Sequence, residues 1–523
     1  MTQRKQDRPN VGPPEYAVRA RRLAAAGRPR EALASLEPVL MRDPNARPAL
    51  RVAAEILIAL GNPAGAMPYL DRLRSLAPDA PGVHLLAAQA EELLHRFEDA
   101  ARSLERAHTL LPNNANPPAL RARLAERAND LETARRWVGI AAGIDPEHPL
   151  TRLLDAIIRA RTGHPVAAAD ILRRLADDPD AMQTLPPMMR ASVCGELGRV
   201  LDKLGRYADA WSAFQQSHAH REQDPAWAAA DADAAFARVR AAASIVADGF
   251  LDTCPPPMHP APGRVVFMIG VPRSGTTLTE RTLAAHPRVV ATDEQSPLGA
   301  VITAVRSAGQ DRSYESVLRS LDDAACERLR GLYFDQAARI LGRLGPDSIV
   351  LDKLPLNLLD LPLIARVFPD APLIMSLRDP LDSCLSNAQQ QMVPNPSMKA
   401  LGRLDTGSRF IAELLSLWLA ARDTLRMRWT ESRYEDFVTD PESHVRRLTA
   451  FLGLDWHDAM LDRSARTRGP TIATPSYEAV SGDITTRAVG RWSRYRDAIS
   501  ADLAASVETT LRPVRQALGY HEA

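Results

Sequence analysis

The sequence predicts two structural classes in one chain: an all-α superhelix of stacked helical repeats, followed by an α/β domain with a central parallel sheet. Two observations lead to this prediction. Proline, glycine and alanine recur about every 34 residues in the first part of the chain. The second part opens with an apolar run of strand length, a glycine-containing turn and a helical pattern. With 523 residues, the chain also exceeds the roughly 100 to 200 residues of one domain.

The repeats keep three features in one register. Prolines 34, 34, 34 and 33 residues apart stand at Pro44, Pro78, Pro112, Pro146 and Pro179. The same ladder runs through Gly27, Gly61, His95, Asn129 and Gly163, and five residues later through Ala32, Ala66, Ala100, Ala134 and Ala168. We expect Gly or Asn to end the first helix in the left-handed conformation and Ala to let the next helix pack closely. Proline should close that second helix.

A last copy carries Gly205 and Ala210 after an insertion of eight residues that contains Leu185, Pro186 and Pro187. In its period and its Gly-to-Ala offset, the unit resembles the tetratricopeptide repeat. This resemblance implies about six repeats over residues 14–222. Such arrays often bind a protein partner on their concave face, although the repeats could also only brace the second domain.

The boundary between the two halves is expected within residues 223–262. An alanine-rich helical stretch comes first, and a proline-rich linker runs from Cys254 to Gly263. The predicted domains are therefore the repeats at 14–222, a helix and linker at 223–262, and the α/β domain at 263–520.

Composition narrows the class of partner. Lys+Arg number 65 against 64 Asp+Glu, so no overall charge favours nucleic acid or an anionic membrane. The four cysteines lie far apart and lack the spacing of a metal site, so no metal is expected. The opening residues form no apolar secretory segment, and no run of 18 apolar residues follows. A cytoplasmic location is the expectation.

The α/β half begins with a candidate phosphate-binding turn. The apolar run Val265–Gly270 precedes the sequence VPRSGTT and a helical stretch. Backbone N–H groups and the positive end of a helix would point at an anion there. Gly270, Gly275 and Thr277 fit the pattern of nucleoside-triphosphate loops, but Thr276 stands where those loops carry lysine. A kinase-like enzyme therefore becomes the alternative, and a donor with a single 5′-phosphate fits better.

The run Arg273, Ser274, Gly275, Thr276 and Thr277 resembles the 5′-phosphosulfate loop of the sulfotransferases. The resemblance implies 3′-phosphoadenosine 5′-phosphosulfate (PAPS) as donor and adenosine 3′,5′-bisphosphate (PAP) as product. Farther along, Leu373–Leu377 reads as a strand, followed by Arg378 and, eight residues later, Ser386. This pair resembles the family's 3′-phosphate site. A surface salt bridge with Asp379 or Asp382 is the alternative for Arg378.

Three further residues resemble the tyrosylprotein sulfotransferases in particular. The resemblance implies that Tyr434 lies against the donor nucleotide, and that Ser476 and Arg491 belong to a late loop over the 3′-phosphate. Arg491 could instead be a solvated arginine. The resemblance covers about residues 263–497.

Sulfuryl transfer needs in-line attack, positive charge at the leaving oxygen and a base for the acceptor hydroxyl. The resemblance implies that Lys353 and Arg273 supply the charge and Glu294 is the base. Lys353 could otherwise be a surface lysine, and Asp293 is the reserve candidate for the base. The small-molecule enzymes of the family use histidine, but His286 is interpreted as structural.

The acceptor remains open between a peptide tyrosine, a saccharide hydroxyl and a small-molecule hydroxyl. The alternative without catalysis is a repeat adaptor whose second half is a degenerate enzyme domain.

Overall fold

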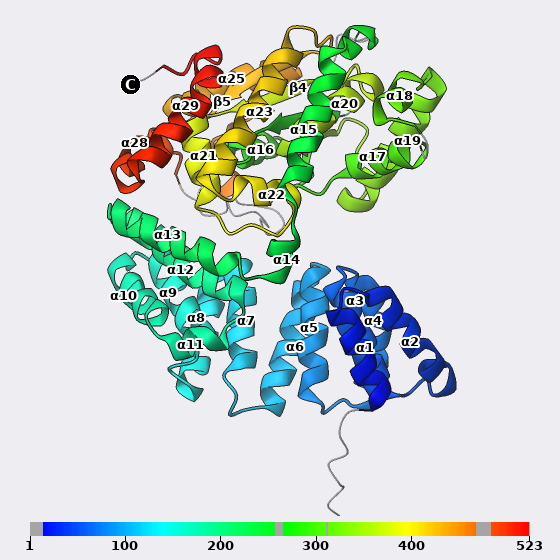
Figure 1. Ribbon diagram of the computed structural model, residues 1–523, viewed down its shortest axis with the longest axis vertical. Helices are drawn as coiled ribbons and strands as arrows, with labels where there is room; N and C mark the ends of the chain where they lie inside the picture. Colours follow the sequence, from blue (N-terminus) through cyan, green and yellow to red (C-terminus); the bar gives the residue numbers. More distant parts are fainter. Residues whose placement is uncertain (1–13, 257–264, 310–311, 467–482, 522–523) are drawn as a thin grey trace, which may run out of the picture. The chain divides into compact units, whose positions relative to one another are not determined.

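The computed structural model describes residues 14–256, 265–309, 312–466 and 483–521, and the chain divides into two compact units, Met1–Met182 and Gln183–Ala523 (Figure 1). The first unit is helical, and the second contains a parallel sheet. The predicted fold class is confirmed.

The first unit is built from antiparallel helix pairs. Its helices are α1 (Glu15–Ala25), α2 (Pro29–Arg42), α3 (Arg47–Ala59), α4 (Pro63–Leu76), α5 (Pro81–Leu93), α6 (Phe97–Leu110), α7 (Asn116–Arg127), α8 (Leu131–Ile144), α9 (Pro149–Arg161) and α10 (Pro165–Ala176), before the short α11 (Pro179–Thr184).

The predicted register of the repeats is confirmed by the backbone. Left-handed φ angles between 59° and 87° occur at Gly27, Gly61, His95, Asn129 and Gly163. The ladder alanines Ala32, Ala66, Ala100, Ala134 and Ala168 are each 0% exposed. The helices α2, α4, α6 and α8 end two residues before a ladder proline, as expected. The exception is Pro179, which begins α11 because proline fits the first position of a helix.

The second unit begins with another helix pair and continues into the sheet. Its helices are α12 (Pro187–Lys203), α13 (Tyr207–Arg221), α14 (Pro225–Ala229), α15 (Ala232–Ala247), α16 (Thr276–Ala284), α17 (Pro297–Ser307), α18 (Tyr314–Arg319), α19 (Asp323–Leu341), α20 (Leu361–Val367), α21 (Pro380–Ala388), α22 (Pro396–Leu401), α23 (Leu404–Arg422), α24 (Tyr434–Thr439), α25 (Pro441–Leu452), α26 (Arg463–Arg466), α28 (Arg491–Tyr495) and α29 (Ala501–Ala517). Its strands are β1 (Val265–Gly270), β2 (Val289–Ala291), β3 (Ile349–Lys353), β4 (Leu373–Leu377) and β5 (Trp429–Arg433).

The compact units divide earlier than the expected linker. The last repeat pair, α12 and α13, packs within the second unit, where the Arg221 guanidinium donates to the Gly402 carbonyl at 2.7 Å. Helix α15, expected within the linker region, contacts α22 and α23. Long-range contacts of this kind leave no periodic trace in the sequence. The domain ranges 14–222, 223–262 and 263–520 stay a prediction.

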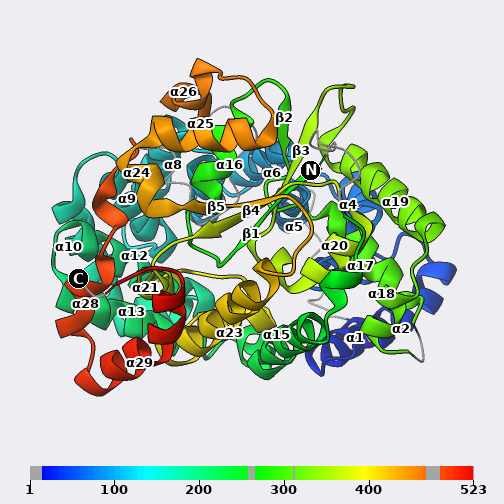
Figure 2. The same ribbon diagram turned by 90° about the horizontal axis from the view of Figure 1, so that it is seen from above.

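The five strands form one parallel sheet in the order β2-β3-β1-β4-β5. Strand β1 is buried along its whole length, as its apolar sequence predicts for a strand covered on both faces. Val266 and Met268 pack with Leu283 of α16 and Leu448 of α25. On the opposite face, the Phe267 ring lies 5.2 Å from the ring of Phe368. Figure 2 shows α16 and α25 on one side of the sheet and α15 and α23 on the other.

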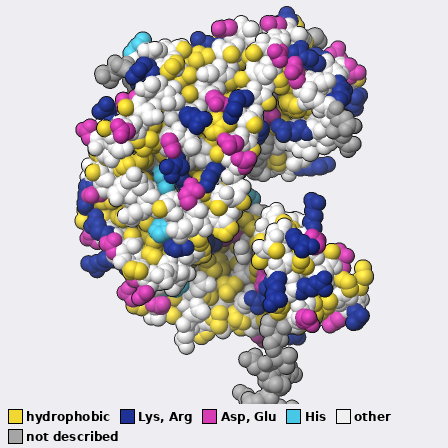
Figure 3. Space-filling model, viewed as in Figure 1, with side chains coloured by type: hydrophobic (Ala, Val, Ile, Leu, Met, Phe, Trp, Pro, Cys, Tyr) yellow, Lys and Arg dark blue, Asp and Glu magenta, His cyan; other side chains and the backbone are white. Residues whose placement is uncertain are grey.

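Among the described residues, no helix is long and apolar enough to cross a membrane. Figure 3 shows basic and acidic side chains interspersed over the visible face, in line with a net charge of +1. Any strongly positive site must therefore be local.

Candidate active site at the carboxyl edge of the sheet

At the carboxyl end of each strand, or in the loop that follows it, stands one of the residues that the sequence predicts for the site. The loop after β1 carries Arg273, the turn after β2 carries Glu294, and β3 ends at Lys353. Arg378 follows β4 directly, and Tyr434 follows β5. Because the strands are parallel, all five residues lie at the same edge. The chain leaves β1 and β4 in opposite directions along the strand order, and ligands bind at such a switch point in open α/β sheets.

The turn between β1 and α16 has the conformation of an anion-binding loop. Arg273 and Gly275 have left-handed φ angles of 72° and 88°, and Gly270 has a φ of 155°. Thr276 and Thr277 are buried and form the first positions of α16, where backbone N–H groups have no partner within the helix. The loop can therefore present main-chain donors and the positive helix end to a phosphate.

The loop depends on glycine at position 270, and we expect Gly270→Ala to lower the free energy of unfolding by about 1 to 3 kcal/mol. A Cβ atom there would lie 2.5 Å from the Ser376 carbonyl oxygen, so backbone must move. Thermal unfolding measures the effect. The matched control is Gly331→Ala within α19, where a Cβ meets nothing within 4 Å and alanine favours the helix. Equal melting temperatures for the two variants would contradict the prediction.

The two predicted phosphate elements lie in contact. The Arg273 Nε donates to the Ser386 Oγ at 3.2 Å, and Arg378 donates to the Arg273 carbonyl at 3.3 Å. The Arg378 guanidinium also lies 4.9 Å from the centre of the Tyr434 ring, which packs on Gly275. Arg378 lies 3.5 Å from Asp382, one of the partners of the alternative ion pair, but both side chains are buried, so this pair is not at the surface. Residues 105 apart in sequence thus lie in contact.

Several buried polar atoms beside the loop have no hydrogen-bond partner among the described residues. They are the hydroxyl oxygens of Ser274, Ser376 and Ser383 and the Nε of Arg378. All four residues line one narrow hollow. Leaving a buried polar group unpaired costs about 1 to 3 kcal/mol. The hollow has no room for a water molecule, so a ligand could pair with these groups only if the surrounding side chains move apart.

The loop region also concentrates positive charge. Burial, together with the nearby Arg378 and Arg491, lowers the pKa of Arg273 to about 10, so the group stays charged at neutral pH. An anion placed among these arginines would relieve their mutual repulsion. Within the described ranges, no group of three or more His, Cys, Asp or Glu side chains could hold a metal ion.

A mostly buried ion cluster lies at the carboxyl ends of β2 and β3, next to the phosphate-binding loop in the strand order. The Lys353 Nζ lies 2.6 Å from the Glu294 carboxylate and 3.1 Å from the Glu280 carboxylate. The side chains of Lys353 and Glu280 are 0% exposed, whereas that of Glu294 is 36% exposed. The alternative of a surface lysine is therefore wrong. Of the two carboxylates, only Glu294 is open to an incoming acceptor.

Sequence reasoning missed Glu280. The sequence does place a carboxylate four residues after Thr276 on the helix that follows the loop, and such a position can face the strand ends. The burial of Glu280 could not be predicted from the sequence, because polar and apolar residues alternate irregularly around it.

The reserve candidates are placed less favourably than Glu294. Asp293 is ion-paired with Arg281 at 2.6 Å, and burial raises its pKa. His286 lies beyond the carboxyl end of α16, at the opposite edge of the sheet from the loop, and its Nδ1 accepts from the Arg288 N–H at 3.2 Å. The structural interpretation of His286 agrees with this position.

Arg491 is tied down and not freely solvated. It lies 3.1 Å from the Asp202 carboxylate and donates to the Gln389 side-chain oxygen at 2.7 Å. The Asp382 carboxylate accepts from the backbone N–H groups of Gly490 and Trp492, each at 2.8 Å, and lies 3.5 Å from the Arg378 guanidinium. Residues 490–492 are thus held against α21, next to Arg378. Ser476 lies outside the described residues.

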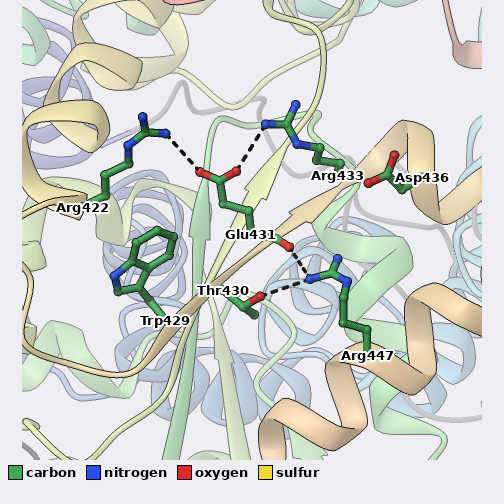
Figure 4. A pocket seen from close by; sticks show the side chains of 7 residues that line it. All are labelled: Arg422, Trp429, Thr430, Glu431, Arg433, Asp436 and Arg447. Carbon is green, nitrogen blue, oxygen red and sulfur yellow. Dashed lines mark hydrogen bonds and ion pairs between the residues drawn. The ribbon is translucent and has the colours of Figure 1, made fainter. Parts of the chain in front are cut away.

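A second hollow, of about 410 Å³, lies along the edge strand β5 (Figure 4). Figure 4 shows the Glu431 carboxylate between Arg422 and Arg433, at 3.6 and 3.3 Å. Arg447 donates to the Glu431 carbonyl and the Thr430 hydroxyl. The arginines of this hollow already have acceptors, so we place the candidate site at the strand ends.

The parallel sheet, the glycine-containing loop and the adjacent second anion element define the class: a P-loop-like α/β domain behind a helical repeat array. Residues 265–458 match the family described as the sulfotransferase family, and residues 23–90 match the tetratricopeptide repeat. The chain therefore carries tetratricopeptide repeats and a sulfotransferase-family domain.

Individual proteins are also similar to this chain. A protein-tyrosine sulfotransferase 1 from Danio rerio is 29% identical over 207 residues, which cover 38% of this chain and 55% of the relative. An uncharacterized protein from Aquifex aeolicus is 27% identical over 246 residues, covering 45% of this chain and 31% of the relative. The chain thus spans about a third and about half of the lengths of these two relatives. The sulfotransferase domain of the Synechococcus PCC 7002 olefin synthase is 21% identical and covers 49% of this chain and 98% of that domain, with a TM-score of 0.32, too low to carry an argument.

Proposed function

We propose that the protein is a PAPS-dependent sulfotransferase, which moves a sulfuryl group from PAPS to an acceptor hydroxyl and releases PAP. One observation carries the proposal. A phosphate loop without lysine lies in direct contact with a second anion element, through the Arg273 to Ser386 and Arg378 to Arg273 hydrogen bonds. A nucleotide with phosphates on both its 5′ and 3′ sides needs two adjacent anion sites. The family match supports the same donor.

The donor would lie across the strand ends. The 5′-phosphosulfate fits the loop, where Arg273, Ser274, Gly275, Thr276 and Thr277 offer main-chain and side-chain donors. The unpartnered Arg378 Nε and the Ser386 hydroxyl suit the 3′-phosphate. Tyr434 would lie against the nucleotide, and Arg491 and Ser476 would belong to the segment over the 3′-phosphate.

The sulfuryl group would then face the Lys353–Glu294 pair. In the transfer, the acceptor oxygen forms a bond to sulfur while the bond from sulfur to the bridging phosphate oxygen breaks. The acceptor proton passes to Glu294, and Lys353 and Arg273 place positive charge at the leaving oxygen. The partly exposed Glu294 carboxylate must turn from Lys353 toward the acceptor for this step.

We propose a protein or peptide tyrosine as the first acceptor class to test, because one relative is named a protein-tyrosine sulfotransferase. A saccharide or small-molecule hydroxyl presents the same O–H group to a base. The repeats are a candidate surface for a protein partner, as in other arrays of this kind. Transfer of radioactive sulfate from PAPS into a lysate, followed by identification of the labelled species, distinguishes these classes.

Thermal unfolding with PAP and with ATP tests the donor. A ligand that binds only the folded state stabilises it by about 2.7 kcal/mol at 100 times its Kd, so we expect PAP to raise the melting temperature and ATP to raise it much less. Stabilisation by ATP alone would overturn the proposal in favour of the kinase-like alternative. Binding of PAP without transfer to any acceptor in the lysate would favour the repeat adaptor.

A further inference from the structure

A buried carboxylate, Glu280, joins the two groups that the proposed chemistry uses. It lies on the second turn of α16, and both its side chain and that of Lys353 are fully buried. One carboxylate oxygen lies 3.1 Å from the Lys353 Nζ. The other accepts the backbone N–H of Asp293 at 3.2 Å. Glu280 therefore contacts both β3 and the turn that carries Glu294.

That turn is held in an uncommon conformation. Asp293 and Glu294 are consecutive residues with left-handed φ angles of 50° and 66°, a backbone conformation that is unfavourable outside glycine. Within the described residues, the contacts that oppose this cost include three hydrogen bonds or ion pairs. They are the Asp293 N–H to Glu280, the Asp293 carboxylate to Arg281 at 2.6 Å, and the Gln295 N–H to the Thr292 carbonyl at 3.0 Å. Loss of Glu280 would remove one of the two contacts by which α16 holds Asp293, the other being the ion pair with Arg281.

Glu280 is also a counter-charge of Lys353. A buried ammonium is stable only while a carboxylate compensates it. When Glu294 accepts the acceptor proton it becomes neutral, and Lys353 keeps its counter-charge only from Glu280. The geometry therefore separates the roles of the two carboxylates: the exposed one receives the proton, and the buried one keeps the lysine charged.

We propose that Glu280 is a positioning residue of the transfer reaction: it fixes the turn that carries Glu294 and holds Lys353 charged and in place while Glu294 takes up the proton. This inference rests on the proposed function for the roles of Glu294 and Lys353. The contacts from which it starts are independent of that function.

The ionisation of Glu280 adds a pH dependence. Burial raises its pKa to about 7; Lys353 on β3 and Arg281 on its own helix lower the value, and Asp293 on the turn raises it. Glu294, on the same turn, faces it across Lys353. Glu280 is thus ionised above about pH 7 and protonated below. We expect the rate of the wild-type protein to fall as the pH decreases through about 7, because protonated Glu280 no longer compensates the charge of Lys353 when Glu294 takes up the acceptor proton.

The test compares Glu280→Gln with the wild-type chain in the transfer of radioactive sulfate from saturating PAPS into lysate acceptors. Gln can still accept the Asp293 N–H but carries no charge. We expect a rate about tenfold lower than that of the wild type. The fall of the rate through about pH 7 should be lost, and the Kd for PAP should stay within about twofold of wild type. The matched control is Asp360→Asn, since Asp360 is also buried and paired with an arginine, Arg238, at 3.2 Å. Asp360→Asn should keep the wild-type rate and its fall through about pH 7.

A second variant gives a readout that does not depend on activity. In a crystal structure of Glu280→Ala, which lacks both the charge and the acceptor, the Glu294 carboxylate should lie more than about 4 Å from the Lys353 Nζ. An unchanged turn, or a Glu280→Gln protein with wild-type rate and pH profile, would overturn the inference. Failure of the proposed function is recognised separately, since the wild-type chain would then bind no PAP.

Discussion

Replacing Glu294 by Gln should lower the rate of sulfate transfer by about 10² to 10⁴, the contribution expected of a general base. Gln keeps nearly the same shape but cannot take up the acceptor proton. The Glu294 side chain is 36% exposed and lies 2.6 Å from Lys353, so we expect it to face the acceptor and not the 3′-phosphate. The Kd for PAP should hardly change. Transfer of radioactive sulfate at saturating PAPS measures the rate, and titration with PAP measures the affinity.

His286→Asn is the matched control for a histidine mechanism. The structure places His286 beyond the carboxyl end of α16, whereas the phosphate loop precedes its amino end. We therefore expect near wild-type transfer from His286→Asn. A Glu294→Gln protein with normal transfer, together with an inactive His286→Asn protein, would show that the base has been assigned wrongly.

Replacing Arg378 by Ala should weaken PAP binding by about 1.5 to 3 kcal/mol, the worth of a hydrogen bond to a charged group. This corresponds to a Kd about 10 to 150 times higher. The Nε of Arg378 has no hydrogen-bond partner among the described residues, so a 3′-phosphate would gain a charge-assisted donor there. Isothermal titration with PAP measures the change. Adenosine 5′-phosphate, which lacks the 3′-phosphate, should lose little affinity.

Two further variants separate this effect from loss of the fold. Arg447→Ala removes an arginine that donates to Thr430 and to the Glu431 carbonyl in the hollow along β5, and it should leave PAP binding unchanged. Arg378→Lys keeps the charge opposite Asp382, 3.5 Å away in the wild type, but loses the planar fork, and it should bind with intermediate affinity. A folded Arg378→Ala protein with wild-type affinity for PAP would rule out the 3′-phosphate assignment.

The sequence by itself determined the local structure of this protein. A left-handed position such as Gly27 or Asn129 ends a helix through its own backbone preference, and Ala32 marks where the next helix packs closely, so a ladder of such residues specifies the repeats. In the same way, an apolar run that ends in Gly270 and a Ser/Thr turn specifies a strand, an anion loop and a helix. Interactions within a few residues of the chain decide each of these features.

Only the tertiary structure decided which of these residues meet. The strand order brings Arg273 to Ser386, 113 residues away, and Lys353 to Glu294, 59 residues away. It also buries Glu280 between α16 and the strand ends, and it ties Arg491 to Asp202 of the last repeat pair. No periodic pattern encodes such contacts, because they depend on the order of strands in the sheet and on what covers each helix. The candidate residues could be predicted one by one, whereas their pairing and the second carboxylate beneath Lys353 follow from the packed fold.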